Sequence, residues 1–425
     1  MSRHWMACAI AATHEEYVMK PLILPTAITT ACLLTAAAAH ASGPAFTGLF
    51  AKAYDASTVF ANPAGMSRLE GTQMTGNGLL IADLSDFEVN ENQTTVDGGN
   101  PRGSDPTLVP SFFYSHQYKE SWHFGYSLNV PTGFGATNGP NWAGRYYSDR
   151  FSLIYVALSP AVSYSFSDSF SLGAASRIMY SDSEVRTQVN NNLVGDRFED
   201  GHLTAQADGF GAGFSVSALY SLSPDTRFGL VWNSKVNIDM DAEVDLHNVR
   251  RPQEIIDRIQ SQTFELADNV PQSVGMGLYH RMPNDWDFTL DALWLEFSDF
   301  GVTDVYLEEG TLQVPQGLYN DFWTVTAGTS WPINARMRGS VGILWMEQPV
   351  DDANRSFGMD LDEMWGVGAG VTYKLASGND MELSVDLLDT GSGPIDTGDS
   401  PLKGRVVGKS KDHYSLLLDF SFNWR

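Results

Sequence analysis

The sequence predicts an all-β protein, a transmembrane antiparallel β-barrel of about fourteen strands with an N-terminal plug segment in its lumen. Three observations lead to this prediction. The chain begins with a segment typical of secretion. Most of its remaining length alternates apolar and polar residues, and the connections between the alternating stretches are short and long in turn.

Residues 1–41 are predicted to be a signal peptide. Lys20 precedes an apolar run over residues 21–39, and Ala39-His40-Ala41 then supplies a cleavage site of small residues. We expect cleavage after Ala41. We also expect translation to start at Met19, an unusually long positive region being the alternative.

Composition excludes several classes of protein. The two cysteines, Cys8 and Cys32, both precede the predicted cleavage site, so disulfides and thiolate chemistry are excluded from the mature chain. A lipoprotein is disfavoured because Cys32 lacks the Leu that a lipoprotein signal carries three residues before its cysteine. No other stretch of ~18 apolar residues exists, which excludes a spanning helix. The net charge of −25 makes the chain a poor binder of nucleic acid. Solvated acidic loops explain this charge, and contact with anionic surface lipid through divalent cations is the alternative.

The alternating stretches have the period of β-strands. Near the C-terminus, apolar residues occupy every second position from Tyr414 to Trp424, and polar residues fill the gaps except at Leu417. The same pattern covers residues 154–166, 228–240 and 286–294. A charged face is costly in a protein core but suits a wet lumen, while the other face suits lipid.

The connections between these strands have an ordered pattern. Short turns are expected at residues 118–120, 167–168, 223–225, 283–284, 332–334 and 377–379, and long loops at about 83–107, 131–151, 182–208, 241–269, 299–320, 347–360 and 390–411. This pattern and an even strand number are typical of an outer-membrane barrel with both termini on the periplasmic side. A spanning sheet must close because lipid offers no hydrogen-bond partners. Residues 72–425 are therefore assigned to the barrel.

Residues 42–71 do not alternate and are predicted to form the plug. They are small and apolar, they include Phe46, Leu49, Phe50 and Phe60, and they precede the first strand. A frayed N-terminus is the alternative, but these side chains disfavour exposure to water. A barrel of about fourteen strands also encloses more space than its own side chains fill, which leaves room for a plug.

Asn62-Pro63-Ala64-Gly65 closes the N-terminal plug, and further motifs cover residues 142–147, 158–164, 171–173 and 271–278. In these motifs the chain resembles the FadL family of outer-membrane transporters for long-chain fatty acids and related hydrophobic compounds. The resemblance extends over nearly the whole mature chain. One departure is that the last aromatic residue, Trp424, is penultimate, whereas barrel-insertion machinery often reads a terminal aromatic residue.

The resemblance implies passive transport. Outer loops capture a hydrophobic ligand, a lumenal pocket binds it, the plug rearranges, and the ligand leaves sideways through a gap made by a kinked third strand. The third strand is expected at about residues 122–130, and its kink at Gly125, Pro131 or Gly133, with ordinary barrel and loop roles as the alternative. The expected partners are a hydrophobic small molecule, outer-membrane lipid and lipopolysaccharide, and the barrel-insertion machinery.

Candidate ligand-binding residues follow from the same implication. The capture groove is expected between the loops at 182–208 and 241–269, where a short helix carries isoleucines on one face; a helix packed on its own loop is the alternative. Arg177 and Arg186 could bind a carboxylate through a forked hydrogen bond, or could pair with lumenal acids. The full candidate set is Phe46, Phe50, Phe60, Arg177, Arg186, Leu246, Ile255, Ile256, Ile259 and Phe264.

Other functions are less well supported by the sequence. An enzyme is not expected, because the histidines lie in no nucleophile motif and Gly-x-Ser-x-Gly is absent. No metal-binding or cofactor-binding motif is found. A water-filled diffusion porin for small polar solutes is the alternative function, although a plugged lumen disfavours it. A purely structural or adhesive barrel has little support.

Overall fold

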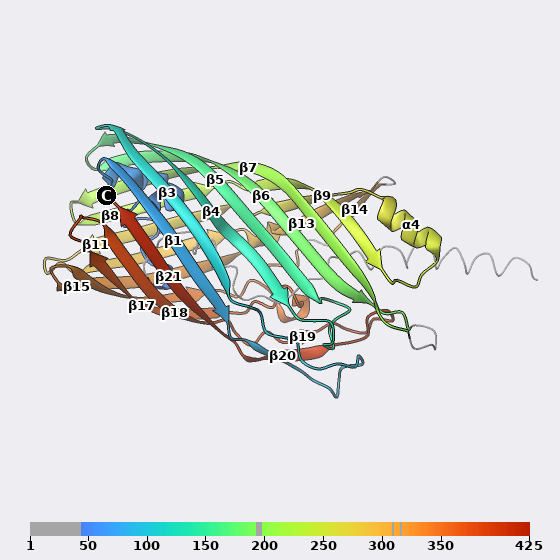
Figure 1. Ribbon diagram of the computed structural model, residues 1–425. Coiled ribbons are helices and arrows are strands. Elements are labelled where there is room, and N and C mark those ends of the chain that lie inside the picture. Colours follow the sequence, from blue (N-terminus) through green and yellow to red (C-terminus); the bar gives the residue numbers. More distant parts are fainter. Residues whose placement is uncertain (1–43, 193–197, 308–309, 315–316) are drawn as a thin grey trace, which may run out of the picture.

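The computed structural model describes residues 44–192, 198–307, 310–314 and 317–425. Fourteen antiparallel strands form a closed barrel, in which β1 (Thr72–Asp83) pairs with β3 on one side and with β21 on the other (Figure 1). The all-β prediction and its strand number are confirmed. The predicted signal peptide, residues 1–41, lies outside the described residues.

The other barrel strands follow one another around the wall. They are β3 (Thr107–Lys119), β4 (Trp122–Thr137), β5 (Arg150–Ser167), β6 (Phe170–Val189), β7 (Gly201–Ser223), β8 (Thr226–Asn233), β11 (Ser273–Arg281), β12 (Asp287–Leu295), β15 (Phe322–Asn334), β16 (Met337–Met346), β17 (Met364–Lys374), β18 (Asp380–Asp389) and β21 (Tyr414–Trp424).

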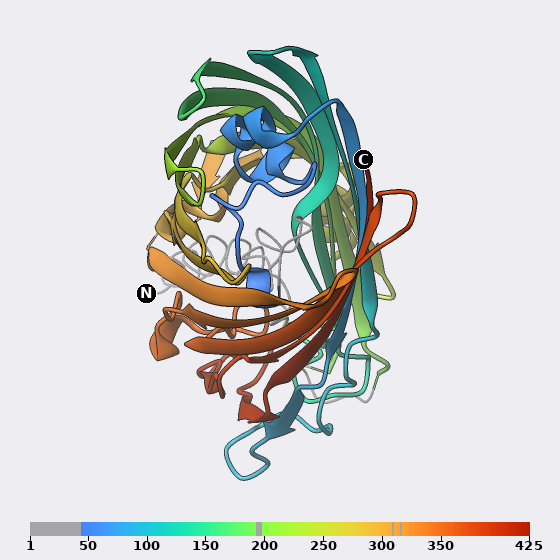
Figure 2. The same cartoon turned by 90° about the vertical axis from the view of Figure 1, so that its left-hand side faces the viewer.

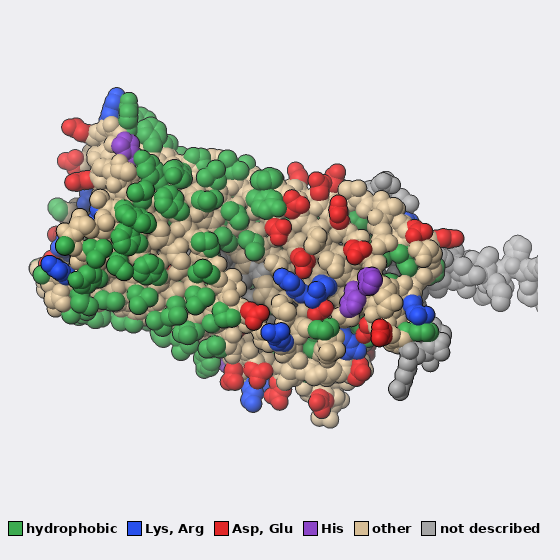
Figure 3. Space-filling model, viewed as in Figure 1, with side chains coloured by type: hydrophobic (Ala, Val, Ile, Leu, Met, Phe, Trp, Pro, Cys, Tyr) green, Lys and Arg blue, Asp and Glu red, His purple; other side chains and the backbone are tan. Residues whose placement is uncertain are grey.

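On the face shown in Figure 3, a belt of apolar side chains covers the short-turn half of the barrel, and charged side chains gather beyond it toward the long-loop end. Leu230, Ile343 and Val367 point outward and are each more than half exposed. Aromatic residues edge the belt, as in the stacked pair Trp286–Trp331 and the tilted pair Trp345–Trp365. This arrangement is that of a lipid-facing wall with aromatic girdles. In the described ranges no helix is long and apolar enough to cross a membrane.

The wall continues past the apolar belt. Strands β9 (Val236–His247), β10 (Phe264–Val270), β13 (Gly301–Leu307) and β14 (Gly310–Gln313) extend it together with β6 and β7. The predicted loop boundaries at 182–208 and 241–269 were therefore wrong, because paired strands extend into both ranges from each side. The third strand also runs to Thr137 rather than ending near residue 130.

Long loops cover the far end of the barrel. A small sheet in the order β19-β20-β2 joins Ile395–Asp396, Val407–Asp412 and Asp86–Val89. Beside it, Phe87, Trp142 and Phe357 pack edge to face. Helix α4 (Gln253–Ser261) stands at the same end, next to β9 (Figure 1). Short 3-10 turns, η4 (Phe297–Asp299) and η5 (Asp352–Asn354), complete this region.

The described part of the N-terminal segment lies inside the barrel (Figure 2). It forms η2 (Pro44–Phe46), α3 (Thr58–Ala61) and η3 (Pro63–Arg68), and most of its side chains are buried. β1 begins directly afterwards, at Thr72. The chain from Pro44 to Leu69 is called the plug below.

Candidate functional site

Inward-facing glycines on the wall receive the plug. A Cβ atom added at Gly173, Gly229 or Gly342 would overlap the backbone of Ala64, Phe50 or Pro44, respectively. These glycines lie on β6, β8 and β16, which are well separated around the barrel. The absence of side chains at these positions lets the plug backbone approach the wall closely, so the wall sequence itself contains the docking surface.

The Asn62-Pro63-Ala64-Gly65 motif anchors the C-terminal half of the plug. Asn62 Nδ2 donates to the carbonyl oxygens of Phe50 at 2.6 Å and Ala218 at 3.3 Å, and its Oδ1 accepts from Ala64 N at 3.1 Å. Ser217 and Ser171 bind the two backbone groups of Ala64 at 3.0 and 2.9 Å. Pro63 opens η3, where its missing N–H costs nothing. The polar groups of Asn62 and Ala64 therefore have partners on the wall or in the plug.

The N-terminal half of the plug is held differently, by two buried wall carboxylates. Asp291 on β12 accepts from the amides of Gly48 at 2.7 Å and Phe50 at 3.1 Å, and Asp386 on β18 accepts from Ala45 N at 2.7 Å. Ala45 and Phe46 have left-handed φ angles of 53° and 57°. Such a conformation costs about 1–2 kcal/mol per residue, so the carboxylates stabilise a strained strip of chain.

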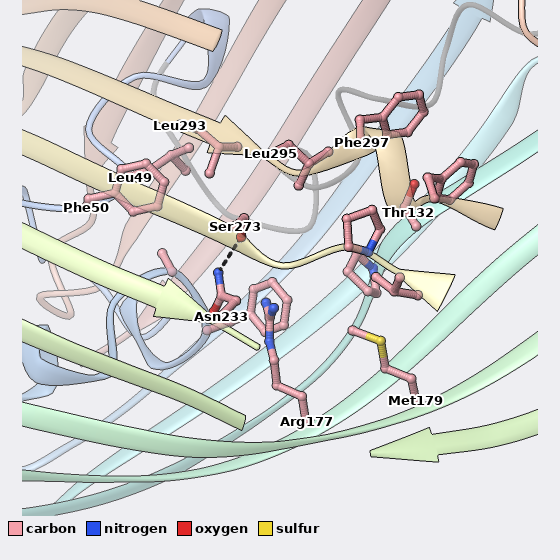
Figure 4. A pocket seen from close by; sticks show the side chains of 16 residues that line it. Leu49, Phe50, Thr132, Arg177, Met179, Asn233, Ser273, Leu293, Leu295 and Phe297 are labelled. Atoms are coloured by element: carbon pink, nitrogen blue, oxygen red, sulfur yellow. Dashed lines mark hydrogen bonds between the residues drawn. The ribbon is translucent and has the colours of Figure 1, made fainter. Parts of the chain in front are cut away.

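A mostly apolar pocket lies in the lumen against the plug (Figure 4). It encloses about 810 Å³ of space between atoms, part of it open to the lumen. Its polar groups are few, and Asn233 donates to Ser273 at 2.9 Å across its wall. The lining residues are Leu49, Phe50, Phe60, Ala61, Pro131, Thr132, Arg177, Met179, Asn233, Val270, Pro271, Ser273, Leu293, Leu295, Phe297 and Phe300. This is the composition of a site for a hydrophobic molecule.

Three of the predicted ligand residues, Phe50, Phe60 and Arg177, line this pocket. The guanidinium carbon of Arg177 lies 4.3 Å from the centre of the Phe60 ring. Within the described ranges, Arg177 forms no ion pair with a carboxylate. A half-buried cation without a counter-ion is suited to bind an anionic group.

The structure places Arg186 and Phe46 elsewhere. Arg186 lies near the outer end of β6 and pairs with Asp149 at 3.3 Å. Phe46 is buried in the core between the plug and the wall, without lining the pocket. Phe46 therefore contributes to the seating of the plug.

The predicted capture residues lie at the long-loop end. Ile255, Ile256 and Ile259 on α4 are half-buried, as is Leu246 on β9. Gln260 ties α4 to the Leu246 carbonyl at 3.2 Å. Phe264 belongs instead to the inner apolar cluster with Met240 and is only 2 % exposed.

An irregularity in the third strand, β4, interrupts the strand pairing of the wall beside the pocket. The β3–β4 pairing stops at Phe112–Leu128, and beyond it β4 pairs only with β5. The β4–β5 register shifts between Asn129 and Thr132, so that Pro131 lies in a bulge and also lines the pocket. Gly133 follows the bulge.

Gly125 lies below this bulge, where the β3–β4 pairing is regular. An added Cβ would lie 2.8 Å from Val59 and 2.9 Å from Met66, so this residue makes room for the plug.

Sequence reasoning missed most of the pocket's far wall. Leu293 and Leu295 continue the inward face of β12 that carries Asp287, Thr289 and Asp291. On the lumenal face of β12, polar residues give way to apolar ones, and this change in the sequence could have predicted an apolar pocket. Asn233, Phe297 and Phe300 carried no such signal, because they lie where strands β8 and β12 end.

Comparison with known proteins supports this description. A family model described as "Outer membrane protein transport protein (OMPP1/FadL/TodX)" matches residues 23–417. The long-chain fatty acid transport protein of Escherichia coli K12 is 22% identical over 418 residues, covering 90% of this chain and 91% of that protein.

Solved structures show the same fold. A Pseudomonas aeruginosa FadL homologue superimposes with a TM-score of 0.77 at 18% identity, covering 91% of this chain and 97% of that one. The P. putida toluene transporter TodX gives a TM-score of 0.67 at 15% identity, covering 91% and 98%. The resemblance inferred from the motifs is confirmed, and the chain belongs to the OMPP1/FadL/TodX family of outer-membrane transport proteins.

Proposed function

We propose that this protein carries long-chain fatty acids or similar hydrophobic molecules passively across the outer membrane. The ligand is captured at the outer loops, binds in the lumenal pocket, displaces part of the plug and leaves sideways into the membrane. The observation that carries this proposal is the apolar pocket, which is bounded by the plug on one side and by the β4 bulge on another.

The position of Pro131 and Thr132 supports a lateral exit. Both residues line the pocket, and both lie where β4 has parted from β3. A ligand that leaves the pocket there enters the lipid-facing part of the wall without crossing the polar lumen. No energy source is needed, because an apolar molecule moves down its own gradient from the pocket into lipid.

The chemistry of the pocket favours an amphiphile with an anionic head. Phe60, Leu293 and Phe297 suit an apolar tail, and Arg177 suits a carboxylate. The E. coli relative is named for long-chain fatty acids and the P. putida one for toluene. A neutral aromatic ligand would use the same apolar walls without Arg177.

Capture at the outer end is assigned to α4. Its isoleucines are half-buried and lie close to β9, where an amphiphile could insert its tail. Contacts with outer-membrane lipid and lipopolysaccharide around the belt, and insertion by the barrel machinery, belong to the same proposal. Both termini are assigned to the periplasmic, short-turn side.

The test is uptake of radiolabelled oleate into cells that lack their own transporter, with and without this protein, combined with planar-bilayer conductance. We expect saturable uptake with little steady conductance, because the plug lies inside the barrel and packs against its wall. A large steady conductance without oleate uptake would instead identify a porin. Saturable toluene uptake without oleate uptake would support transport through the pocket but would reject a carboxylate as the ligand.

A further inference from the structure

Arg425, the residue after the last barrel strand, contacts the plug. Its Nε lies 2.7 Å from Asp380 Oδ2, its guanidinium carbon lies 4.4 Å from the centre of the Tyr54 ring, and its Nη2 donates to the Tyr54 carbonyl at 3.3 Å. The Tyr54 hydroxyl in turn donates to Asp380 at 3.0 Å. These three residues are called the clasp. It joins β21, β18 and the plug at one point.

The clasp depends on Arg425 more than an exposed ion pair would. The side chain of Asp380 is only 2% exposed, and that of Arg425 is 27% exposed. If Arg425 alone is removed, the buried Asp380 carboxylate keeps its desolvation cost without a compensating cation, and the folded state is destabilised. Removing both charges avoids this destabilisation. The planar guanidinium also stacks on Tyr54, which an ammonium group would do less well.

A second arginine holds the other end of the same short piece of plug. Arg227 on β8 donates to the carbonyls of Ala51 at 3.1 Å and Lys52 at 2.7 Å. In the closed order, β11, β12, β15, β16 and β17 separate β8 from β18, so the two arginines act from different parts of the wall. Residues 51–54, called the strap, are therefore held at both ends.

The strap lines a polar cavity that adjoins the ligand pocket. The apolar ligand pocket and this smaller polar cavity share Leu49 and Ala61 as lining residues. The polar cavity encloses about 370 Å³ of space between atoms, part of it open to solvent. The polar cavity is lined further by Lys52, Tyr54, Asp55 and Glu382, which lie on the strap, next to it and on β18. Lys52, Ala53 and Tyr54 of the strap line this polar cavity, and Asp380 begins β18 directly after a short turn. A displaced strap would therefore leave the polar cavity open toward the short-turn end of the barrel.

We propose that Arg425 is a positioning residue that clamps the strap, so that the plug opens the ligand pocket sideways and not along the barrel axis. This inference rests on the proposed transport function. The movable part of the plug is then the strip from Ala45 to Phe50, which the wall carboxylates hold, while the strap stays in place. The clasp separates passage of a hydrophobic ligand from leakage of ions.

The test compares Arg425→Ala with the wild type in planar-bilayer conductance and in oleate uptake. We expect a several-fold rise in steady conductance with oleate uptake retained. Arg405→Ala is the matched control, since Arg405 pairs with Asp396 at 2.6 Å in the sheet at the long-loop end. Wild-type conductance in Arg425→Ala, equal to that of the control, would overturn the inference.

Two further variants separate the clasp from general stability. Asp380→Asn combined with Arg425→Ala removes both charges, so it should restore folding while the raised conductance persists. Wild-type conductance in this double variant would overturn the inference even if Arg425→Ala fails to insert. Tyr54→Phe loses the hydroxyl contact but keeps the stacked ring, so its conductance should lie between that of the wild type and that of Arg425→Ala. Loss of oleate uptake in the wild type would reject the transport function and leave the conductance comparison readable.

Discussion

Arg177 allows a sharp test of which ligand the pocket accepts. In Arg177→Gln the side chain keeps hydrogen-bond donors and loses its charge. A hydrogen bond to a charged group contributes about 1.5–3 kcal/mol, and each 1.4 kcal/mol is tenfold in affinity. Because no carboxylate of the described ranges pairs with Arg177, its charge is free for a ligand. We therefore expect a loss of about tenfold to hundredfold in the affinity for oleate.

The assay is displacement of a fluorescent fatty acid from the purified protein by oleate and by methyl oleate. The two competitors share one tail, and only oleate carries a negative charge. Arg177 also stacks on Phe60, at 4.3 Å, and a change in that contact should affect both competitors alike. The difference between the two losses therefore isolates the contribution of the charge.

Arg186→Gln is the control, since Arg186 pairs with Asp149 and does not line the pocket. It should leave the affinities for both competitors unchanged. Equal losses for oleate and methyl oleate in Arg177→Gln, or no loss for either, would refute the assignment of Arg177 to the ligand's head group.

Further predictions concern the plug and the outer loops. Asp291→Asn should speed amide hydrogen exchange over Gly48–Phe50, because one of two acceptor oxygens is replaced by a donor; unchanged exchange would contradict the role of Asp291 in holding the plug. Gly229→Ala should lower the unfolding temperature through about 1–3 kcal/mol of overpacking against Phe50, whereas Gly103→Ala, which meets nothing, should not. Burial, and then the nearby Asp83, raise the pKa of Asp360 to about 7. The stability that this carboxyl contributes is fully present below its unfolded pKa and is lost as the pH rises through about 7. Asp360→Asn should therefore raise the unfolding temperature more at pH 8 than at pH 5, and an equal change at both pH values would contradict this.

The strands within the lipid belt could be predicted from the sequence. The predicted stretch from Tyr414 to Trp424 coincides with β21, because lipid on one side and a polar lumen on the other enforce a period of two. Beyond the belt this constraint is absent. Asp182, Asp208 and Asp241 lie side by side on the outward face of β6, β7 and β9. Because outward charges are typical of loops, the sequence predicted loops at these positions. Strand ends outside the membrane were therefore misjudged.

The site could be predicted only in part. Phe50, Phe60 and Arg177 were chosen from apolarity, parity and family resemblance, and they line one pocket. The wall that completes this pocket comes from residues such as Asn233 and Phe297, which are distant in sequence and meet only after the barrel closes. The glycines that receive the plug could not be assigned either, because their role depends on which part of the plug faces each strand.

The central claim, that hydrophobic molecules pass through this pocket, is tested most directly by blocking it. Leu293 and Leu290 lie on the same strand, the first lining the pocket and the second 41% exposed on the outer face of the barrel. The measurement is the initial rate of radiolabelled oleate uptake in Leu293→Trp and Leu290→Trp, at equal amounts of folded protein in the membrane. We expect Leu293→Trp to abolish uptake and Leu290→Trp to retain it, whereas wild-type uptake in both variants would contradict passage through the pocket.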